Sequence, residues 1–269
     1  MTKDPLRRSR RFKRNRLFKR FALFGGGILV CSALGVGFFY IPYFSITAVS
    51  LEDLRTLPEK DITVEISAHL DRKTWGLLPQ NNFFVFLFTA SRLEQTLKQK
   101  FPKIKSITIK KRPPHAIAVL FEERKIWATI CKDASCFYAD EEGFLFGKSS
   151  RISGSLFFSI EDRRNVTHAI GTTIASPEEF KNIKTLLQRI ETVTGASFSA
   201  LMLSGSEDLI SKYEIKTKDG WRIILDSKTN GELAAANFIS AFEGILQKNM
   251  EGIDYIDVRL ENKIFYKYK

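Results

Sequence analysis

The sequence predicts an α+β protein in which one N-terminal transmembrane helix precedes two extracytoplasmic domains. Three observations support this prediction: a basic segment leads directly into an uncharged run, helical and alternating patterns then follow one another, and short strand patterns dominate the second half. The predicted parts are a basic cytoplasmic tail at 1–20, the transmembrane helix at 21–41, a β-α-α-β-β domain at 42–123 and an antiparallel β domain with two helices at 124–269.

The basic tail holds ten Lys or Arg residues against one acid, Asp4, and so carries +9 of the chain's net charge of +12. The 21 uncharged residues that follow, Phe21 to Ile41, are enough for a helix to cross a bilayer. Because basic residues stay on the cytoplasmic side, the tail is expected inside and the rest of the chain outside. The topology determinants nearest the helix are Arg14, Arg16, Lys19 and Arg20.

Two other interpretations of the N-terminal region are open. A cleaved signal peptide would end at a small-x-small site such as Ala33-Leu34-Gly35 or Gly35-Val36-Gly37, although the apolar run is long for a signal peptide. The basic tail could bind nucleic acid phosphates, but it has no folded domain to specify a site. We therefore expect it to contact anionic lipid and no nucleic acid.

The first extracytoplasmic domain is predicted from capping signals and periodicity. Thr56-Leu-Pro-Glu59 and Ser91-Arg-Leu-Glu94 both have the spacing of a capping box, and Pro102 ends the second helix. Alternating residues predict the strands. The predicted elements are a strand at 43–51, a helix that starts at the Thr56 box and carries Ile62, Ile66 and Leu70 on one face, a loop at 76–82, a helix from 91, and strands around 107–110 and 117–121. No role follows for residues 70–84.

The second domain is read mainly as short strands. Ser176-Pro-Glu-Glu179 predicts a helix start, Gly195 its end, and Asp219-Gly220 a tight hairpin. The strands are expected at 126–131, 137–139, 144–146, 156–160, 213–217, 221–225, 255–260 and 264–268, and a second helix at 233–247. Cys131 and Cys136 either form a disulfide across a hairpin or stay as two free thiols.

Several local patterns resemble the FtsQ family of cell-division proteins, called DivIB in Gram-positive bacteria. The order of tail, span, β-α-α-β-β domain and β domain is similar, and the resemblance covers nearly the whole chain. The similar stretches are Phe101 to Pro114, Phe121-Glu-Glu-Arg124 with Trp127-Ala128, Tyr138-Ala-Asp140 with Gly143-Phe-Leu-Phe146, and Tyr255-Ile-Asp-Val-Arg259. The chain departs from the family at Ile126, where a Pro is usual, and near Leu51, where a Gly is usual.

The resemblance implies a scaffold of the divisome at the division septum of the cytoplasmic membrane. The first domain would be a POTRA domain, which with the transmembrane helix would contact other divisome membrane proteins. The last strand would accept a strand from an FtsB- or FtsL-type partner (DivIC or FtsL) for septal wall synthesis, by β-augmentation. The implied contact residues are Leu260, Asn262, Lys263, Ile264, Phe265, Tyr266 and Tyr268. Alternatively, Phe265 and Tyr266 only complete the sheet.

No enzyme, cofactor or metal site is expected. His69, His115 and His168 lie in separate predicted elements, and Gly143 to Ser149 is one residue short of a phosphate-binding loop and follows a hairpin. The alternative function is a membrane-anchored POTRA docking protein for export or envelope assembly. Such proteins usually carry several repeats or a barrel, neither of which the sequence predicts. An extracytoplasmic sensor would need a cytoplasmic output domain larger than a 20-residue tail.

Overall fold

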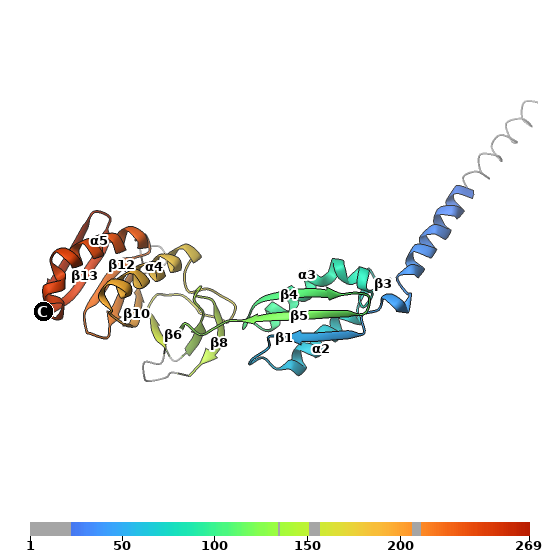
Figure 1. Ribbon diagram of the computed structural model, residues 1–269, viewed down its shortest axis with the longest axis horizontal. Helices are drawn as coiled ribbons and strands as arrows, with labels where there is room; N and C mark the ends of the chain where they lie inside the picture. The colour runs from blue at the N-terminus through green and yellow to red at the C-terminus, as the bar shows by residue number, and fades with distance from the viewer. Residues whose placement is uncertain (1–22, 134, 151–156, 206–210) are drawn as a thin grey trace, which may run out of the picture. The chain divides into compact units, whose positions relative to one another are not determined.

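The structure is a computed structural model that describes residues 23–133, 135–150, 157–205 and 211–269. Its fold class is α+β, as predicted. The chain divides into two compact units, one formed by Met1–Lys98 and Ser106–Glu122, the other by Gln99–Lys105 and Glu123–Lys269. Many of the helices and strands of both units are labelled in Figure 1.

Residues 23–38 are helical, and most of their side chains are exposed. Among the residues that the structure describes, no helix combines the length and the apolar character needed to cross a membrane. The predicted topology determinants Arg14, Arg16, Lys19 and Arg20 lie outside the described residues, with the rest of the basic tail.

Apart from the N-terminal helix, the described part of the first unit contains a three-stranded sheet, two α-helices and a small hairpin. Its sheet has the order β1-β5-β4, in which β1 and β5 run parallel. The fully buried side chains of Ile62 on one helix, and of Phe86 and Leu93 on the other, contribute to its core. The elements are β1 (Ala48–Glu52), α2 (Glu59–Leu70), β2 (Lys73–Thr74), β3 (Leu78–Pro79), α3 (Phe83–Lys100), β4 (Ile104–Arg112) and β5 (Ala116–Glu123).

Neither predicted capping box lies at the start of a helix as the structure has it. Helix α2 has Pro58 as its N-cap and no side-chain capping bond. Helix α3 begins at Phe83, so Ser91 lies in its middle. The Asn82 side chain caps it instead, because Asn82 Oδ1 accepts hydrogen bonds from the backbone N–H of Phe84 at 2.9 Å and of Val85 at 3.4 Å.

Two more boundaries differ from the prediction. A 3-10 helix, η1 (Pro42–Phe44), occupies the start of the predicted first strand, which therefore begins only at Ala48. The predicted loop at 76–82 contains the turn and second strand of the β2–β3 hairpin. This hairpin also accounts for much of residues 70–84, for which the sequence suggested no role.

The second unit is built on one nine-stranded sheet of order β14-β13-β12-β11-β10-β9-β6-β7-β8. Its helices are α4 (Pro177–Thr194), α5 (Gly231–Gly244) and the 3-10 helix η2 (Leu246–Gly252). The strands are β6 (Ala128–Lys132), β7 (Ser135–Ala139), β8 (Leu145–Ser149), β9 (Phe158–Asp162), β10 (Phe198–Ser204), β11 (Lys212–Thr217), β12 (Arg222–Asp226), β13 (Ile253–Leu260) and β14 (Lys263–Tyr268).

The prediction of an antiparallel domain is wrong, because the sheet is mixed. Strands β9 and β10, β12 and β13, and β6 and β9 pair in parallel. Helix α4 connects β9 to β10, and α5 with η2 connects β12 to β13. A helical crossover returns the chain to the end of the sheet from which it left, so the strands that it joins run in the same direction.

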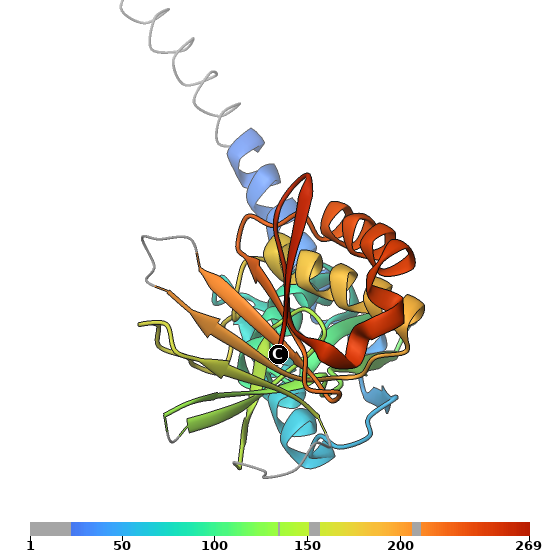
Figure 2. The ribbon, with the colours of Figure 1, turned by 90° about the vertical axis from the view of Figure 1, so that its left-hand side faces the viewer.

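Helices α4 and α5 lie side by side on one face of the sheet (Figure 2). Helix α4 starts with the predicted capping box, in which Ser176 Oγ accepts from Glu179 N, and it ends at Gly195 in the left-handed conformation. The buried faces of the two helices and the sheet form one core, to which Phe180, Leu186 and Phe238 contribute. Burial of such side chains is the main stabilising contribution to this unit.

The contact between α4 and α5 depends on Gly231, the first residue of α5. A Cβ atom at Gly231 would lie 2.1 Å from the backbone oxygen of Asn182 on α4. We expect Gly231→Ala to lower the free energy of unfolding by about 1–3 kcal/mol, because backbone must move to admit the methyl group. Urea denaturation measures this loss. Gly244→Ala is the control and should lose no stability, since no atom lies within 4 Å of a Cβ placed there. Equal stability of the two variants would contradict the close contact.

Candidate partner-binding edge

Strand β14 is the outermost strand of the nine-stranded sheet. It pairs antiparallel with β13 on one side, with Ile256 opposite Tyr266 and Asp257 opposite Phe265. Within the part of the chain that the structure describes, no strand pairs with its other side. An edge strand presents unpaired N–H and C=O groups, to which an incoming strand can bind.

Large apolar side chains on this edge are open to solvent. The exposed fractions are 53% for Phe265, 39% for Tyr266 and 38% for Tyr268, and Leu260 at the end of β13 is 52% exposed. Ile264 is half-buried and packs against the core. Charged residues often protect natural edge strands from pairing, and β14 carries Lys263 and Lys267 beside these exposed aromatic side chains.

The β13–β14 connection is held by helix α5. Asn237 Nδ2 donates a hydrogen bond to the backbone oxygen of Glu261 at 2.7 Å. Glu261 and Asn262 form the turn between the two strands, and Asn262 is exposed. The predicted contact residues from Leu260 to Tyr268 therefore form one continuous hairpin, which α5 fixes at its turn.

Charged pairs connect β11, β12 and β13, the three strands that precede β14 in the sheet order. Arg222 on β12 donates to Glu214 on β11 at 3.0 Å and to Asp254 on β13 at 2.7 Å. These hydrogen bonds raise the pKa of Arg222 above its ordinary value. Burial alone would raise the pKa of Asp257 on β13, but hydrogen bonds from the Arg259 side chain and backbone lower it. The Arg222 pairs connect β13 to β12, whereas the Asp257–Arg259 pair lies within β13 itself.

Part of the edge also packs against its own sheet. The rings of Tyr266 and Tyr268 meet at 5.6 Å between centroids in an edge-to-face arrangement. A Cβ atom placed on Gly252 would come within 3.3 Å of Tyr268 Cδ1, so this ring lies close to the backbone there. Tyr268 therefore has a structural role as well, whereas Phe265 is the more exposed side chain.

The edge is basic and lies next to a small hollow. Lys263 and Lys267 belong to β14 and are exposed, and no Asp or Glu follows Glu261 in the sequence. The hollow measures about 170 Å³ and is lined by residues that include Leu233, Val258 and Leu260. A partner strand with acidic residues and an apolar side chain near its end would complement this surface.

The two cysteines of the second unit are joined in a disulfide. Cys131 on β6 pairs directly with Cys136 on β7 in the strand register. The bond closes the β6–β7 hairpin, which lies near the β8 end of the sheet, opposite the β14 end. It belongs to the scaffold of this unit and takes no part in the β14 edge.

A buried charged cluster in the second unit was not anticipated from the sequence. Asp162 at the end of β9 accepts from Arg164 Nη2 at 2.7 Å and lies 3.0 Å from His168 Nε2. Burial would raise the pKa of Asp162, but the hydrogen bonds from His168 and Arg164 lower it well below its ordinary value. Arg164 Nη2 also donates to the backbone oxygen of Ile174. The cluster therefore ties the loop after β9 to the sheet.

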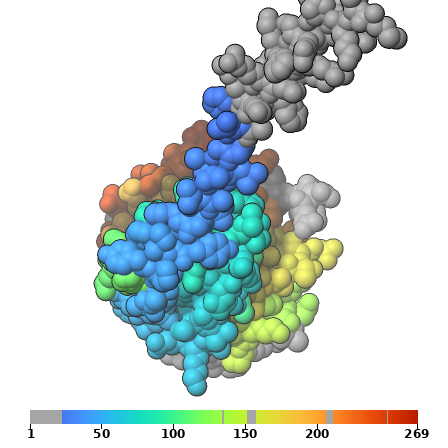
Figure 3. Space-filling model, turned by 90° about the vertical axis from the view of Figure 1, so that its right-hand side faces the viewer, coloured from blue at the N-terminus to red at the C-terminus, as the bar shows by residue number. Residues whose placement is uncertain are grey.

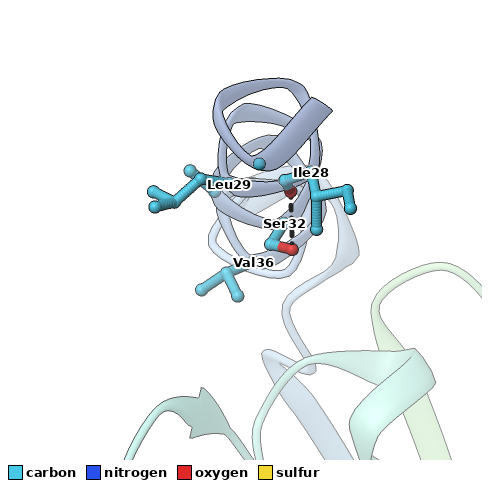
Figure 4. A pocket seen from close by; sticks show the side chains of 6 residues that line it. Ile28, Leu29, Ser32 and Val36 are labelled. Atoms are coloured by element: carbon cyan, nitrogen blue, oxygen red, sulfur yellow. Dashed lines mark hydrogen bonds between the residues drawn. The ribbon is translucent and has the colours of Figure 1, made fainter. Parts of the chain in front are cut away.

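The N-terminal helix has a hollowed surface where small residues alternate with large ones. Figure 4 shows Ile28, Leu29 and Val36 around this hollow, with Ser32 Oγ donating to Ile28 O at 2.8 Å. A second hollow includes Gly27 and Cys31. Small side chains in such hollows permit the close approach of another helix. A partner helix for the N-terminal helix stays a prediction.

No protein-family model matches the chain, and no curated protein matches it. A solved structure that does match is the major extracytoplasmic domain of the trans isomer of the bacterial cell division protein DivIB from Geobacillus stearothermophilus. The match covers 48% of this chain and 98% of that chain, at 10% sequence identity and a TM-score of 0.27. A similarity at this level carries no argument, so function is inferred from the residues of this chain.

Proposed function

We propose that the chain is a non-catalytic scaffold of the bacterial division machinery whose last strand binds a strand of an FtsB- or FtsL-type protein. The observation that carries the proposal is the unpaired β14 edge with its exposed Phe265 and Tyr266. The sequence patterns shared with the FtsQ and DivIB family supply the identity of the partner. The Tyr255–Arg259 stretch, which carries part of that resemblance, lies on β13 beside this edge.

Strand addition at β14 would combine two contributions. Each backbone hydrogen bond contributes roughly 0.5–1.5 kcal/mol net, and a handful of them only partly offsets the cost of association. Exposed aromatic residues at the centre of an interface supply the remaining affinity when a partner buries them. Specificity would come from Lys263 and Lys267, which favour an acidic partner strand.

The proposal places the chain in the cytoplasmic membrane, with the basic tail inside, Phe21 to Ile41 as the anchor and the bulk of the chain outside. Anchoring both partners in one membrane raises their effective concentration and compensates for a modest strand interaction. The first unit would act as a POTRA-type docking domain and, with the anchor helix, contact other divisome membrane proteins. The tail would contact anionic lipid.

Affinity purification from native membranes tests this function. The full-length protein is compared with a Phe265→Ala/Tyr266→Ala variant, and co-purifying proteins are identified by mass spectrometry. We expect small division proteins of the FtsB and FtsL type with the native chain and their loss with the variant. Ile170→Ala is the matched control, because Ile170 is 40% exposed but lies outside the edge. Recovery of export components in place of division proteins would favour the docking alternative and contradict the proposal.

A further inference from the structure

The β2–β3 hairpin of the first unit presents two large apolar side chains to solvent at its tip. Trp75 is 83% exposed and Leu77 is 60% exposed. Trp75 and Gly76 both have positive φ, at 51° and 72°, and so form the tight turn between two strands of two residues each. A tryptophan in the left-handed region is uncommon, and here its side chain packs into no core.

The hairpin tip lies at the C-terminal end of the apolar N-terminal helix. The Tyr40 hydroxyl donates a hydrogen bond to the backbone oxygen of Leu77, and Asn82 Nδ2 donates to the backbone oxygen of Phe39 at 3.1 Å. Leu77 and Asn82 flank the second strand of the hairpin. The end of the helix and both ends of this strand therefore belong to one hydrogen-bonded junction.

Helix α3 adds further aromatic residues to this junction. The ring of Phe84 lies 5.9 Å from that of Phe38 and 5.1 Å from that of Phe44. In the space-filling view, the blue segment that contains residues 38–44 lies against the teal surface of α3 (Figure 3). Phe88, one helical turn after Phe84, is 83% exposed, and Tyr43 is 61% exposed.

The residue types on this surface are those that proteins place at the interface between water and the hydrocarbon core of a membrane. Trp and Tyr concentrate at membrane interfaces, because one end of each side chain is apolar and the other is polar. Arg72 and Lys73 immediately before the tip are exposed, against one acid, Asp71. Basic residues beside an apolar tip favour an anionic lipid surface over an apolar protein groove.

We propose that the β2–β3 hairpin inserts Trp75 and Leu77 into the interface of an anionic phospholipid bilayer, as a second membrane contact of the first unit. The inference rests on the proposed membrane anchoring, because the apolar helix brings the hairpin to the bilayer surface. Two attachments would restrict the rotation of the first unit about its anchor, which a single helix does not.

Tryptophan fluorescence in proteoliposomes tests the insertion. The full-length chain is reconstituted in phosphatidylglycerol and phosphatidylethanolamine, with bromine placed at shallow or deep acyl positions. The other two tryptophans, Trp127 and Trp221, belong to the second unit and are partly or fully buried. The difference between the native chain and Trp75→Phe isolates Trp75. We expect blue-shifted emission from Trp75 and stronger quenching by shallow than by deep bromine.

A relocated tryptophan is the control for this experiment. Val64 on α2 is 63% exposed, so Val64→Trp in a Trp75→Phe background reports on a comparably open position of the same unit. Flotation of the liposomes tests anchoring separately. If the protein floats but Trp75 is not quenched, or if the Val64→Trp side chain is quenched equally, the hairpin insertion is wrong while the anchor stands. If the protein does not float, the proposed anchoring itself fails.

Discussion

Replacing Phe265 and Tyr266 with alanine is expected to weaken partner binding by at least about tenfold, equivalent to about 1.4 kcal/mol. Phe265 is open to solvent, but Tyr266 packs against Tyr268, so the double substitution is expected to lower the unfolding free energy by about 0.5–1.5 kcal/mol. The affinity of the full-length chain for an FtsB-type protein, both in lipid nanodiscs, gives the first quantity. Thermal unfolding gives the second.

The control for this prediction removes an apolar side chain of similar exposure elsewhere in the same unit. Ile170→Ala is expected to bind the partner like the native chain, because Ile170 lies in the loop before α4. Unchanged affinity in the edge variant would show that Phe265 and Tyr266 only complete the sheet. Loss of binding together with a fall in stability larger than this expected cost would indicate damage to the fold.

The largest stability effect is expected at the buried cluster around Asp162. Its carboxylate accepts from Arg164 Nη2 at 2.7 Å and from Arg164 N at 2.9 Å, and both side chains are buried. Asp162→Ala should therefore lower the free energy of unfolding by about 3–5 kcal/mol, because Arg164 is left as a buried charge without its partner. Urea denaturation measures this loss.

A matched control lies next to the cluster, in the ion pair between Glu161 on β9 and Arg163. Glu161 and Arg163 form the same i,i+2 pair at 3.1 Å, but their side chains are 48% and 60% exposed. An exposed ion pair contributes at most about 1 kcal/mol, so Glu161→Ala should change stability little. Similar losses of unfolding free energy in Asp162→Ala and Glu161→Ala would show that burial does not determine how much the Asp162 cluster stabilises the fold.

The same cluster predicts how stability depends on pH. The pKa of Asp162 is lower in the folded chain than in the unfolded chain, where it is about 3.9. Its contribution is therefore complete above the unfolded pKa and is lost as the pH falls from there towards the folded pKa. The stability difference between the native chain and Asp162→Ala should shrink between about pH 5 and pH 3. A difference that stays constant over this range would contradict the assignment.

Elements with local signals could be predicted from the sequence. Helix α4 has its cap at Ser176, its Pro and Glu residues in the first turn and its stop at Gly195, all within the segment itself. The hairpin at Asp219-Gly220 is equally local, and β11 and β12 form on either side of it. In both cases backbone preferences and side-chain capping agree, so no distant contact is needed to specify the element.

Properties set by distant contacts could not be predicted. The direction of β13 against β12 depends on the crossover through α5, which no strand pattern contains. Strand β10 was missed altogether, although its Leu201 and Leu203 are buried and it pairs with both β9 and β11. The capping role of Asn82 was missed because the helix start was predicted at Ser91, which left the apolar residues 83–90 at the start of α3 unassigned.

The candidate edge combines both kinds of information. The aromatic residues of β14 are visible in the sequence, but their position on the outermost strand follows only from the sheet order. The pairing of Asp162 with His168 likewise depends on how the loop after β9 folds back. The exposed tip at Trp75 depends on a hairpin of two-residue strands, which is too short for a periodic signal.

Site-specific photo-crosslinking in living cells tests the central claim, strand addition at β14, most directly. A photoreactive phenylalanine analogue replaces Phe265 in the full-length chain, and in a parallel strain replaces Ile170. The account predicts a covalent adduct with an FtsB- or FtsL-type division protein from position 265 and none from position 170. Adducts with no division protein from position 265, or the same adducts from both positions, would contradict it.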